Sequence, residues 1–394
     1  MRCFRGFDWA AFAVTLALIA IGTVAIWSAG NARAEAAFHG LWVRNLATAA
    51  FGLVLYFALA LLDYRKWVGL AALPFYIAST VLLVAVLVFG SEQFGGKRWL
   101  WFFQPSEIAK LAVILLLAAV FGTCGARKEE AGSGLGRLGF GGFVLAAALV
   151  GVPVVLILAE PDLGTALTLV PAVLVMLFVA GVWRRGFLVL VIAGGMAALT
   201  LLGAVYEAER PGASPERRAR IMRYVPLHDH QVRRVRTFLF PDDDRRGAGY
   251  NLRQAKISIG SGGFSGKGIG KGETNHLKFL PPAISMNDFI FCVYAEETGF
   301  VGSAVLLTLF GILLVSCCRA AFASADGCGR LLSLGTATLV FAHVYVNIAM
   351  SIGIVPITGL PLPFISSGRT FLIVVMCALG LVQSVSIHGK EIIC

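Results

Sequence analysis

Ten long apolar runs constrain the fold of this 394-residue chain more than any other feature of its sequence. A helix needs about 20 mostly apolar residues to cross the hydrocarbon core of a bilayer. The composition agrees, because 58% of the residues are hydrophobic and only 14% are charged, against about 25% charged in a typical soluble domain. The sequence therefore predicts an all-α, polytopic membrane protein and excludes a soluble domain, a disordered chain and a nucleic-acid-binding module. The ten expected transmembrane helices lie at about 9–28, 45–62, 68–90, 108–123, 139–159, 163–182, 186–205, 291–318, 331–353 and 370–387.

The basic residues of the short loops orient these spans. Loops on the cytoplasmic side of a membrane carry an excess of Lys and Arg. One side of the predicted topology carries twelve such residues: Arg2, Arg5, Arg65, Lys66, Arg127, Lys128, Arg137, Arg184, Arg185, Arg319, Arg330 and Lys390. The other side carries five: Arg33, Arg44, Lys97, Arg98 and Arg369. We expect both termini in the cytoplasm, since an even number of spans places them on one side.

A long extracytoplasmic loop, residues 207–288, separates the seventh and eighth predicted helices. It holds fifteen Lys and Arg against nine Asp and Glu, and loops of this length are usually functional. In its first half, 216–240, arginines alternate with apolar residues. That pattern fits either a helix lying among lipid headgroups or a solvated charged face. Its second half contains seven glycines among residues 260–272, which predicts a closely turning backbone.

Four of the predicted helices begin at the outer face with a polar motif. Helix-start chemistry explains each motif alone, because proline and short polar residues are common there. Four such starts beneath one basic loop would also bring positive helix ends together, which favours a bound anion. The motifs are Gln104-Pro105-Ser106-Glu107, Glu160-Pro161-Asp162-Leu163-Gly164-Thr165, Asn287-Asp288 and the stretch from Pro361 to Arg369.

Several ionisable side chains fall inside or beside these spans. Glu107 and Lys110 share a helix face, and charges at this depth are costly unless they are paired or face a wet cavity. They either serve function or form an ion pair that orients helices. Asp288 is the best candidate for an outer-face base, the alternative being a simple N-cap. His343 and Asn347 are expected to make a hydrogen-bonded helix contact rather than a metal site.

Together these motifs resemble the SEDS family (shape, elongation, division and sporulation), and specifically its RodA branch. The resemblance covers nearly the whole chain. It implies a single SEDS-type integral membrane domain over residues 1–394 that acts as a peptidoglycan glycosyltransferase. The residues that carry it include Asp8-Trp9, Asp63-Tyr64-Arg65, Arg98-Trp99, Gln104 to Glu107 with Lys110, Pro161 to Thr165, Gly247 to Tyr250, Ile259 to Gly263, Gly266-Lys267-Gly268, Phe279-Leu280-Pro281, Asp288 to Phe291, Ala295 to Gly299, Asn347 and Val355 to Pro363.

The resemblance also implies a reaction and its participants. Such enzymes polymerise lipid II, a disaccharide-pentapeptide on undecaprenyl diphosphate, at the outer face of the bacterial inner membrane during cell elongation. The implied partners are a class B penicillin-binding protein, other membrane proteins of the elongation complex and membrane lipid, with no nucleic acid. Asp288 is the implied general base. A divalent cation, Mg²⁺ or Mn²⁺, could assist the departing diphosphate, but no cofactor or metal ligand is assigned. The residues expected to bind substrate are Arg98, Glu107, Lys110, Lys267, Lys271 and Ser366.

Two stretches differ from the family pattern. Pro281 to Asp288 is two residues longer than usual, with Met286-Asn287 where the family has His-Thr. Before the last span, Ser366-Ser367-Gly368-Arg369-Thr370 stands where the family commonly reads Ser-Tyr-Gly-Gly-Ser-Ser. Two other functions therefore stay open at the level of sequence: a lipid II flippase, and an inactive scaffold for the cross-linking partner.

Overall fold

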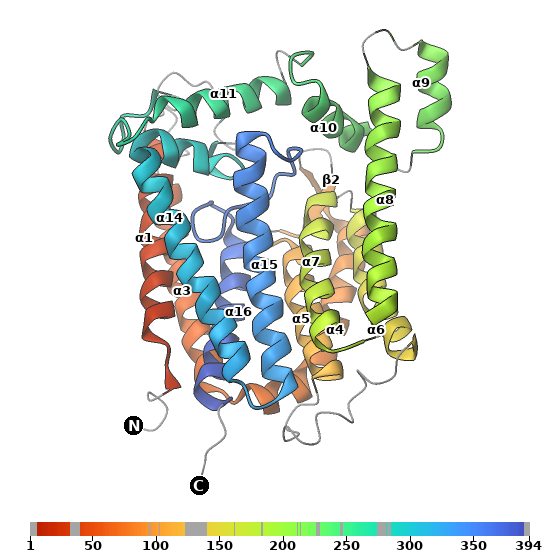
Figure 1. The fold of residues 1–394 in the computed structure, drawn as a ribbon. Helices are drawn as coiled ribbons and strands as arrows, with labels where there is room; N and C mark the ends of the chain where they lie inside the picture. The colour runs from red at the N-terminus through yellow and green to blue at the C-terminus, as the bar shows by residue number, and fades with distance from the viewer. Residues whose placement is uncertain are drawn as a thin grey trace.

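The computed structural model describes residues 6–389, apart from 32–39, 94–95, 102, 123–139, 161, 183, 211, 213, 226–228, 245–246, 274–280 and 282–284. Its described part is a helical bundle with one short hairpin (Figure 1). The helices are α1 (Trp9–Asn31), α3 (Leu41–Leu61), α4 (Tyr64–Phe89), α5 (Pro105–Phe121), α6 (Phe140–Ala159), α7 (Leu163–Val179), α8 (Arg184–Glu209), α9 (Pro215–Met222), α10 (Asp229–Leu239), α11 (Ala248–Ser261), α14 (Ile290–Ala323), α15 (Gly327–Ile352) and α16 (Arg369–His388). Strands β1 (Ser91–Gln93) and β2 (Gly96–Trp99) pair antiparallel.

All ten predicted spans are helices, which confirms the all-α polytopic fold. Eight of them are long and apolar enough to cross a bilayer. The other two, α5 and α7, have 17 residues each. A helix of that length is about 26 Å long, short of the roughly 30 Å hydrocarbon core. Both helices begin at the same end of the bundle. The β1–β2 hairpin beside that end was not predicted.

Helices α10 and α11 cover one end of the bundle, called the loop end below, while α9 stands beside the projecting end of α8 (Figure 1). Of the two alternatives left open for 216–240, one continuous helix is not what the structure has, because α9 ends at Met222 and the chain turns at Arg223 and Tyr224 before α10. Helix α9 buries none of its residues. Helix α10 buries Gln231, Val232 and Thr237. The two helices therefore differ in role, and only α10 packs into the protein.

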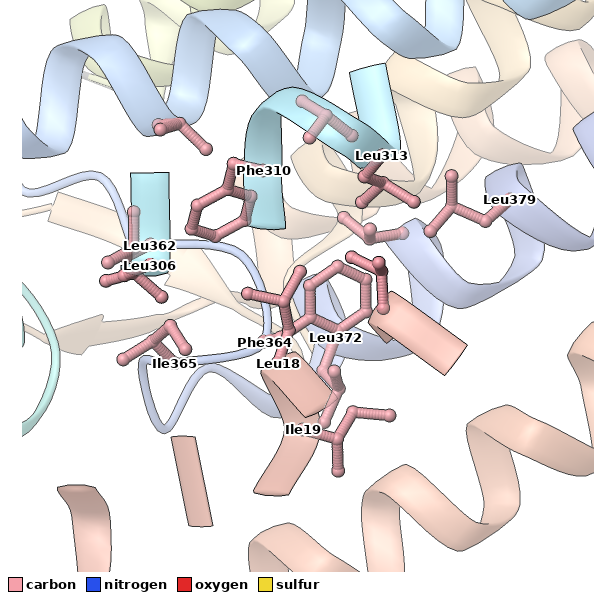
Figure 2. Packing of buried hydrophobic residues seen from close by; sticks show 14 of the residues in the cluster. Leu18, Ile19, Leu306, Phe310, Leu313, Leu362, Phe364, Ile365, Leu372 and Leu379 are labelled. Carbon is pink, nitrogen blue, oxygen red and sulfur yellow. The ribbon is translucent and has the colours of Figure 1, made fainter. Parts of the chain in front are cut away.

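The C-terminal helices form the centre of the bundle, while α8 lies at its edge (Figure 1). About 78% of the apolar window of α16 is buried, against 6% for α8. Between α15 and α16, the segment 353–368 folds back into the bundle. Figure 2 shows its side chains Leu362, Phe364 and Ile365 among residues of α1, α14 and α16. This buried segment holds the start of α16 in place.

The glycine-rich stretch 262–272 docks into a break in α14. Gly299 has a positive φ of 69°, and a Cβ there would lie 2.3 Å from the backbone nitrogen of Gly266. The break frees backbone groups that must find other partners when buried. The amides of Phe300 and Val301 donate to carbonyls of 263 and 264, and the carbonyls of 296 and 297 accept from the amides of 267 and 268. The predicted turning backbone thus fixes the first part of α14.

Candidate active site

A cavity of about 550 Å³ opens at the loop end of the bundle. It is lined by the starts of α5, α7 and α16 and by the segment before α14, which confirms that the four polar helix starts converge. Residues of α10 and α11 also line it. The polar residues at the cavity are Arg44, Asn45, Arg98, Gln104, Glu107, Asp162, Thr165, Arg234, Asn251, Asn287, Asp288, Thr358, Ser367, Arg369 and Thr370.

Asp288 lies in this cavity just before α14, on a segment held from both sides. The flanking Met286 and Phe289 are 1% exposed. The side-chain amide of Asn347 donates to the Asp288 carbonyl at 3.0 Å and to the Leu360 carbonyl at 2.7 Å. This contact ties α15 to the two segments that meet at the site. Asn347 is therefore hydrogen-bonded as expected, but to the segments before α14 and α16 instead of to another helix.

Two arginines set the electrostatics of Asp288. Arg234 of α10 and Arg98 of β2 both line the cavity. Burial raises the pKa of Asp288 from its ordinary 3.8 to about 6, and the positive charges of Arg234 and Arg98 act in the opposite direction. Arg234 is itself fixed, since its Nη1 donates to the Thr358 carbonyl at 2.7 Å. A carboxylate with a pKa near 6 is ionised at neutral pH yet basic enough to accept a proton.

Asp162 links the starts of α5 and α7. Its carboxylate accepts from the backbone amide and hydroxyl of Thr165, at 3.2 and 2.8 Å, and from Gln104 Nε2 at 2.9 Å. Arg98 Nη1 lies 3.9 Å from Asp162 Oδ1. The pKa of the neighbouring Glu160 is raised to about 8, mainly by burial, so this carboxyl group is protonated at neutral pH. Arg98 also donates through Nε to the Glu160 carbonyl at 3.3 Å, so it bridges two residues that come just before α7.

Glu107 and Lys110 form a buried ion pair behind the cavity wall. Their charged atoms are 2.8 Å apart, and Lys110 is fully buried. Lys110 Nζ also lies 2.8 Å from His343 Nε2. Because Lys has only donors, His343 accepts through Nε2 and donates through Nδ1, 3.3 Å from the Pro361 carbonyl. Glu107 reaches the cavity, whereas Lys110 acts through Glu107 and His343.

The other predicted substrate residues are arranged differently. Lys267 pairs with Glu296 at 2.9 Å and with Glu273 at 3.4 Å, outside the cavity lining. Lys271 does not line the cavity either. Ser366 donates to the Asn287 carbonyl at 2.6 Å and accepts from the Leu362 amide at 2.8 Å. It therefore positions the residue next to Asp288.

The cavity also contains residues that the sequence did not single out for the site. Arg234 was considered only as part of a charged loop, Arg44 only as one of the outer-loop basic residues, and Asn45 only as the first residue of a predicted span. Their signal was weak, because an arginine in an arginine-rich segment has no distinctive spacing. Within the described residues, no group of three His, Cys, Asp or Glu side chains is placed to hold a metal ion.

Comparison with known proteins places this architecture in a family. The family model of FtsW, RodA and SpoVE, described as cell cycle proteins, matches residues 8–391. The chain belongs to this family. The predicted resemblance to the SEDS proteins is thereby confirmed.

Individual relatives agree with the assignment. Peptidoglycan glycosyltransferase MrdB of Escherichia coli strain K12 is 36% identical over 383 residues, which cover 96% of this chain and 92% of that protein. The crystal structure of Thermus thermophilus rod shape determining protein RodA superposes with a TM-score of 0.65 at 31% identity, covering 98% of both chains. A chain from a structure described as coordinating polymerization and crosslinking in a peptidoglycan synthase complex gives a TM-score of 0.70 at 31% identity, covering 96% of this chain and 97% of that one.

Proposed function

We propose that this protein polymerises lipid II into glycan strands during cell elongation, with Asp288 as the general base. The chain is a peptidoglycan glycosyltransferase, as its curated relatives are named. The substrate, the role of Asp288 and the elongation-specific task are our inference. The observation that carries it is the carboxylate of Asp288, which has a pKa of about 6 and lies in a cavity that Arg234 and Arg98 also line.

The chemistry needs a base and a cationic environment in one place. The acceptor sugar hydroxyl attacks the anomeric carbon of the donor and loses its proton to Asp288. The bond from that carbon to the lipid diphosphate breaks, and negative charge grows on the departing oxygen. Preorganised positive groups stabilise such charge, and Arg98 lies in the same cavity as Asp288. A divalent cation, Mg²⁺ or Mn²⁺, would serve the same purpose if one binds beside the diphosphate.

The remaining substrate residues act at different distances from the reacting atoms. Arg98 and Glu107 face the cavity and are placed to contact the substrate. Lys110 holds Glu107, and Ser366 holds the segment before Asp288. Lys267 holds the loop that docks on α14 through its pair with Glu296, and Lys271 lies in the same loop. The whole chain, 1–394, works as one integral membrane domain in this proposal.

The proposed setting follows from charge and from the relatives. The excess of Lys and Arg at the end opposite the cavity supports cytoplasmic termini and an outer-facing active site in the bacterial inner membrane. A related chain comes from a complex that joins polymerization to crosslinking. A class B penicillin-binding protein, other elongation-complex membrane proteins and membrane lipid are therefore the proposed partners.

A polymerisation assay in detergent tests the proposed function. Purified full-length protein, with its cross-linking partner, is incubated with labelled lipid II, and the glycan strands are separated by length. Detergent removes the two leaflets, so a flippase has nothing to transport. Strands from the wild type and from the exposed variant Arg233→Gln are the expected result. A folded complex that makes none, with and without added Mg²⁺ or Mn²⁺, would favour a flippase or scaffold.

A further inference from the structure

The starts of α3 and α16 lie side by side at the cavity. The two helices run in the same direction and pack closely. A Cβ at Gly380 would lie 2.6 Å from the Tyr56 carbonyl oxygen, and one at Gly52 would lie 3.0 Å from Met376. Two helical turns back from the Gly52–Met376 contact, about seven residues on each helix, lead to Asn45 and Arg369. This register places Arg44, Asn45 and Arg369 together on one wall of the cavity, which all three line.

This wall has donor groups without acceptors. Asn45 is 2% exposed, and neither its Nδ2 nor its Oδ1 has a hydrogen-bond partner among the described residues. Arg44 and Arg369 are exposed to the cavity and form no ion pair with any residue that the structure describes. Buried polar groups are nearly always hydrogen-bonded, so an unpartnered amide at a cavity requires an explanation. A ligand that Asn45 and the two guanidinium groups share provides one.

The N-terminal ends of α3 and α16 indicate that this ligand is an anion. No side chain caps α3 or α16, since their N-cap residues Gly40 and Gly368 accept no such bond. Free amides at a helix start, together with the helix dipole, favour anions, and phosphate above all. Arginine adds bidentate hydrogen bonds to phosphate oxygens. The wall therefore combines three features that suit a phosphate group.

This wall comes from elements other than those that supply the charges acting on Asp288. Arg44 and Asn45 lie in the first turn of α3 and Arg369 begins α16, whereas the charges that oppose the raised pKa of Asp288 are those of Arg234 on α10 and Arg98 on β2. In an inverting transfer the leaving group departs from the side of the anomeric carbon opposite the attacking oxygen. Its binding site should therefore be remote from the base. Arg44, Asn45 and Arg369 line the same cavity as Asp288 from other elements, which allows a bound donor to contact this wall while the acceptor contacts the base.

We infer that Arg44, Asn45 and Arg369 form a phosphate subsite that holds the diphosphate of the donor lipid as it leaves. This inference rests on the proposed glycosyl transfer and adds a binding site for the leaving diphosphate to the charge of Arg98. As the acceptor oxygen bonds to the anomeric carbon, the bond from that carbon to the diphosphate oxygen breaks. The acceptor proton passes to Asp288, and the electron pair remains on the diphosphate, where the two arginines neutralise it. Arg369 stands at a glycine of the common family motif, so this chain carries an additional cation there.

Binding of undecaprenyl diphosphate to the purified full-length protein in detergent tests the subsite. Loss of a charge-assisted hydrogen bond weakens binding by about tenfold or more. Arg369→Gln and Asn45→Leu should each raise the Kd to that extent, and Arg369→Lys should recover part of the affinity. Arg217→Gln is the matched control, since this exposed arginine of α9 pairs with Glu207 away from the cavity. Undecaprenol, which lacks phosphate, should not compete. Thermal melting checks that each variant is folded.

The outcomes separate this subsite from the general function. If wild type makes glycan strands but Arg369→Gln and Asn45→Leu bind undecaprenyl diphosphate as wild type does, the subsite is refuted and the glycosyltransferase stands. If phosphatidylglycerol displaces the diphosphate probe at equal concentration, the wall binds phospholipid headgroups instead, which also overturns the inference. If wild type makes no strands, the proposed function fails, whatever the binding result. Loss of affinity in both variants together with a lowered rate of strand synthesis is the expected result.

Discussion

Arg234 provides a direct test of how the cavity controls the protonation of Asp288. A Cβ built at Gly359 would lie 3.5 Å from Asp288 Oδ2 and 3.8 Å from Arg234 Nη2. The two charged atoms therefore lie within about 7 Å of each other, where opposite unit charges attract by roughly 2 kcal/mol at an effective dielectric constant of about 20. Water in the cavity screens part of this attraction. If about half of the attraction remains, Arg234 lowers the pKa of Asp288 by about one unit.

The sign of the effect follows from the role of Asp288. A base must be ionised, so strand synthesis is lost as the pH falls through the pKa of Asp288, about 6. Arg234→Gln removes a charge that lowers this pKa, and the acidic limb of the pH–rate profile should move up by about one unit. At pH 6.5 the ionised fraction of Asp288 would then fall from about three quarters to about one quarter.

The assay is the initial rate of glycan synthesis between about pH 5.5 and 8.5 at limiting lipid II. Arg234→Lys keeps the positive charge, so the acidic limb of its pH–rate profile should stay near pH 6. Arg233→Gln is the matched control, because Arg233 is the exposed neighbour on the same helix and does not line the cavity. A limb that stays near pH 6 in Arg234→Gln, even with a lower rate at every pH, would refute the electrostatic reasoning. Arg234 would then be a substrate contact only.

Three further predictions concern the surroundings of the site. Glu107→Ala leaves Lys110 buried without its carboxylate partner, which should cost about 3–5 kcal/mol of stability and most of the activity. The double variant Glu107→Ala with Lys110→Met should recover much of the melting temperature. An unchanged melting temperature in Glu107→Ala would count against a structural ion pair. Gly299→Ala should lower the melting temperature and disturb strand synthesis, because its Cβ would overlap the docked loop backbone, whereas Gly311→Ala, with nothing within 4 Å of its Cβ, should melt as wild type does. Lys267→Ala should reduce stability but leave KM for lipid II unchanged, because Lys267 pairs with a carboxylate outside the cavity; a raised KM would make it a substrate contact.

Hydropathy alone was sufficient to predict the ten apolar helices, because each satisfies its backbone hydrogen bonds within itself and needs only an apolar surface. It could not predict features that depend on contacts between distant segments. The segment 353–368 folds into the bundle because its apolar residues fit between α1, α14 and α16. The break at Gly299 persists because the glycine-rich stretch supplies hydrogen-bond partners. Neither contact has a periodic signal in the sequence.

The acidic side of the site was easier to predict than the basic side. Asp288 and Glu107 stand out because carboxylates are rare in or beside apolar spans. Arg234 does not stand out among the other arginines of its loop, and only the packing of α10 brings it to Asp288. Asn45 is an ordinary polar residue until its neighbours are known.

The two departures from the family pattern provide a related example. They lie far apart in the sequence, yet the side chains of Asn287 and Ser367 hydrogen-bond to each other. The Ser367 amide also donates to the Met286 carbonyl at 3.2 Å. Changes that look independent along the chain thus meet in one contact beside Asp288. The altered loop still delivers this carboxylate to the cavity.

The most direct test of the account is the rate of the chemical step in Asp288→Asn, measured together with lipid II binding on the same preparation. Asparagine keeps the size of the side chain and removes the base. General-base catalysis contributes about 10²–10⁴-fold to a rate, so strand synthesis should fall by at least about a hundredfold. The Kd for lipid II should stay close to that of wild type. A variant that binds lipid II normally and still polymerises within tenfold of the wild-type rate would contradict the claim that Asp288 is the base.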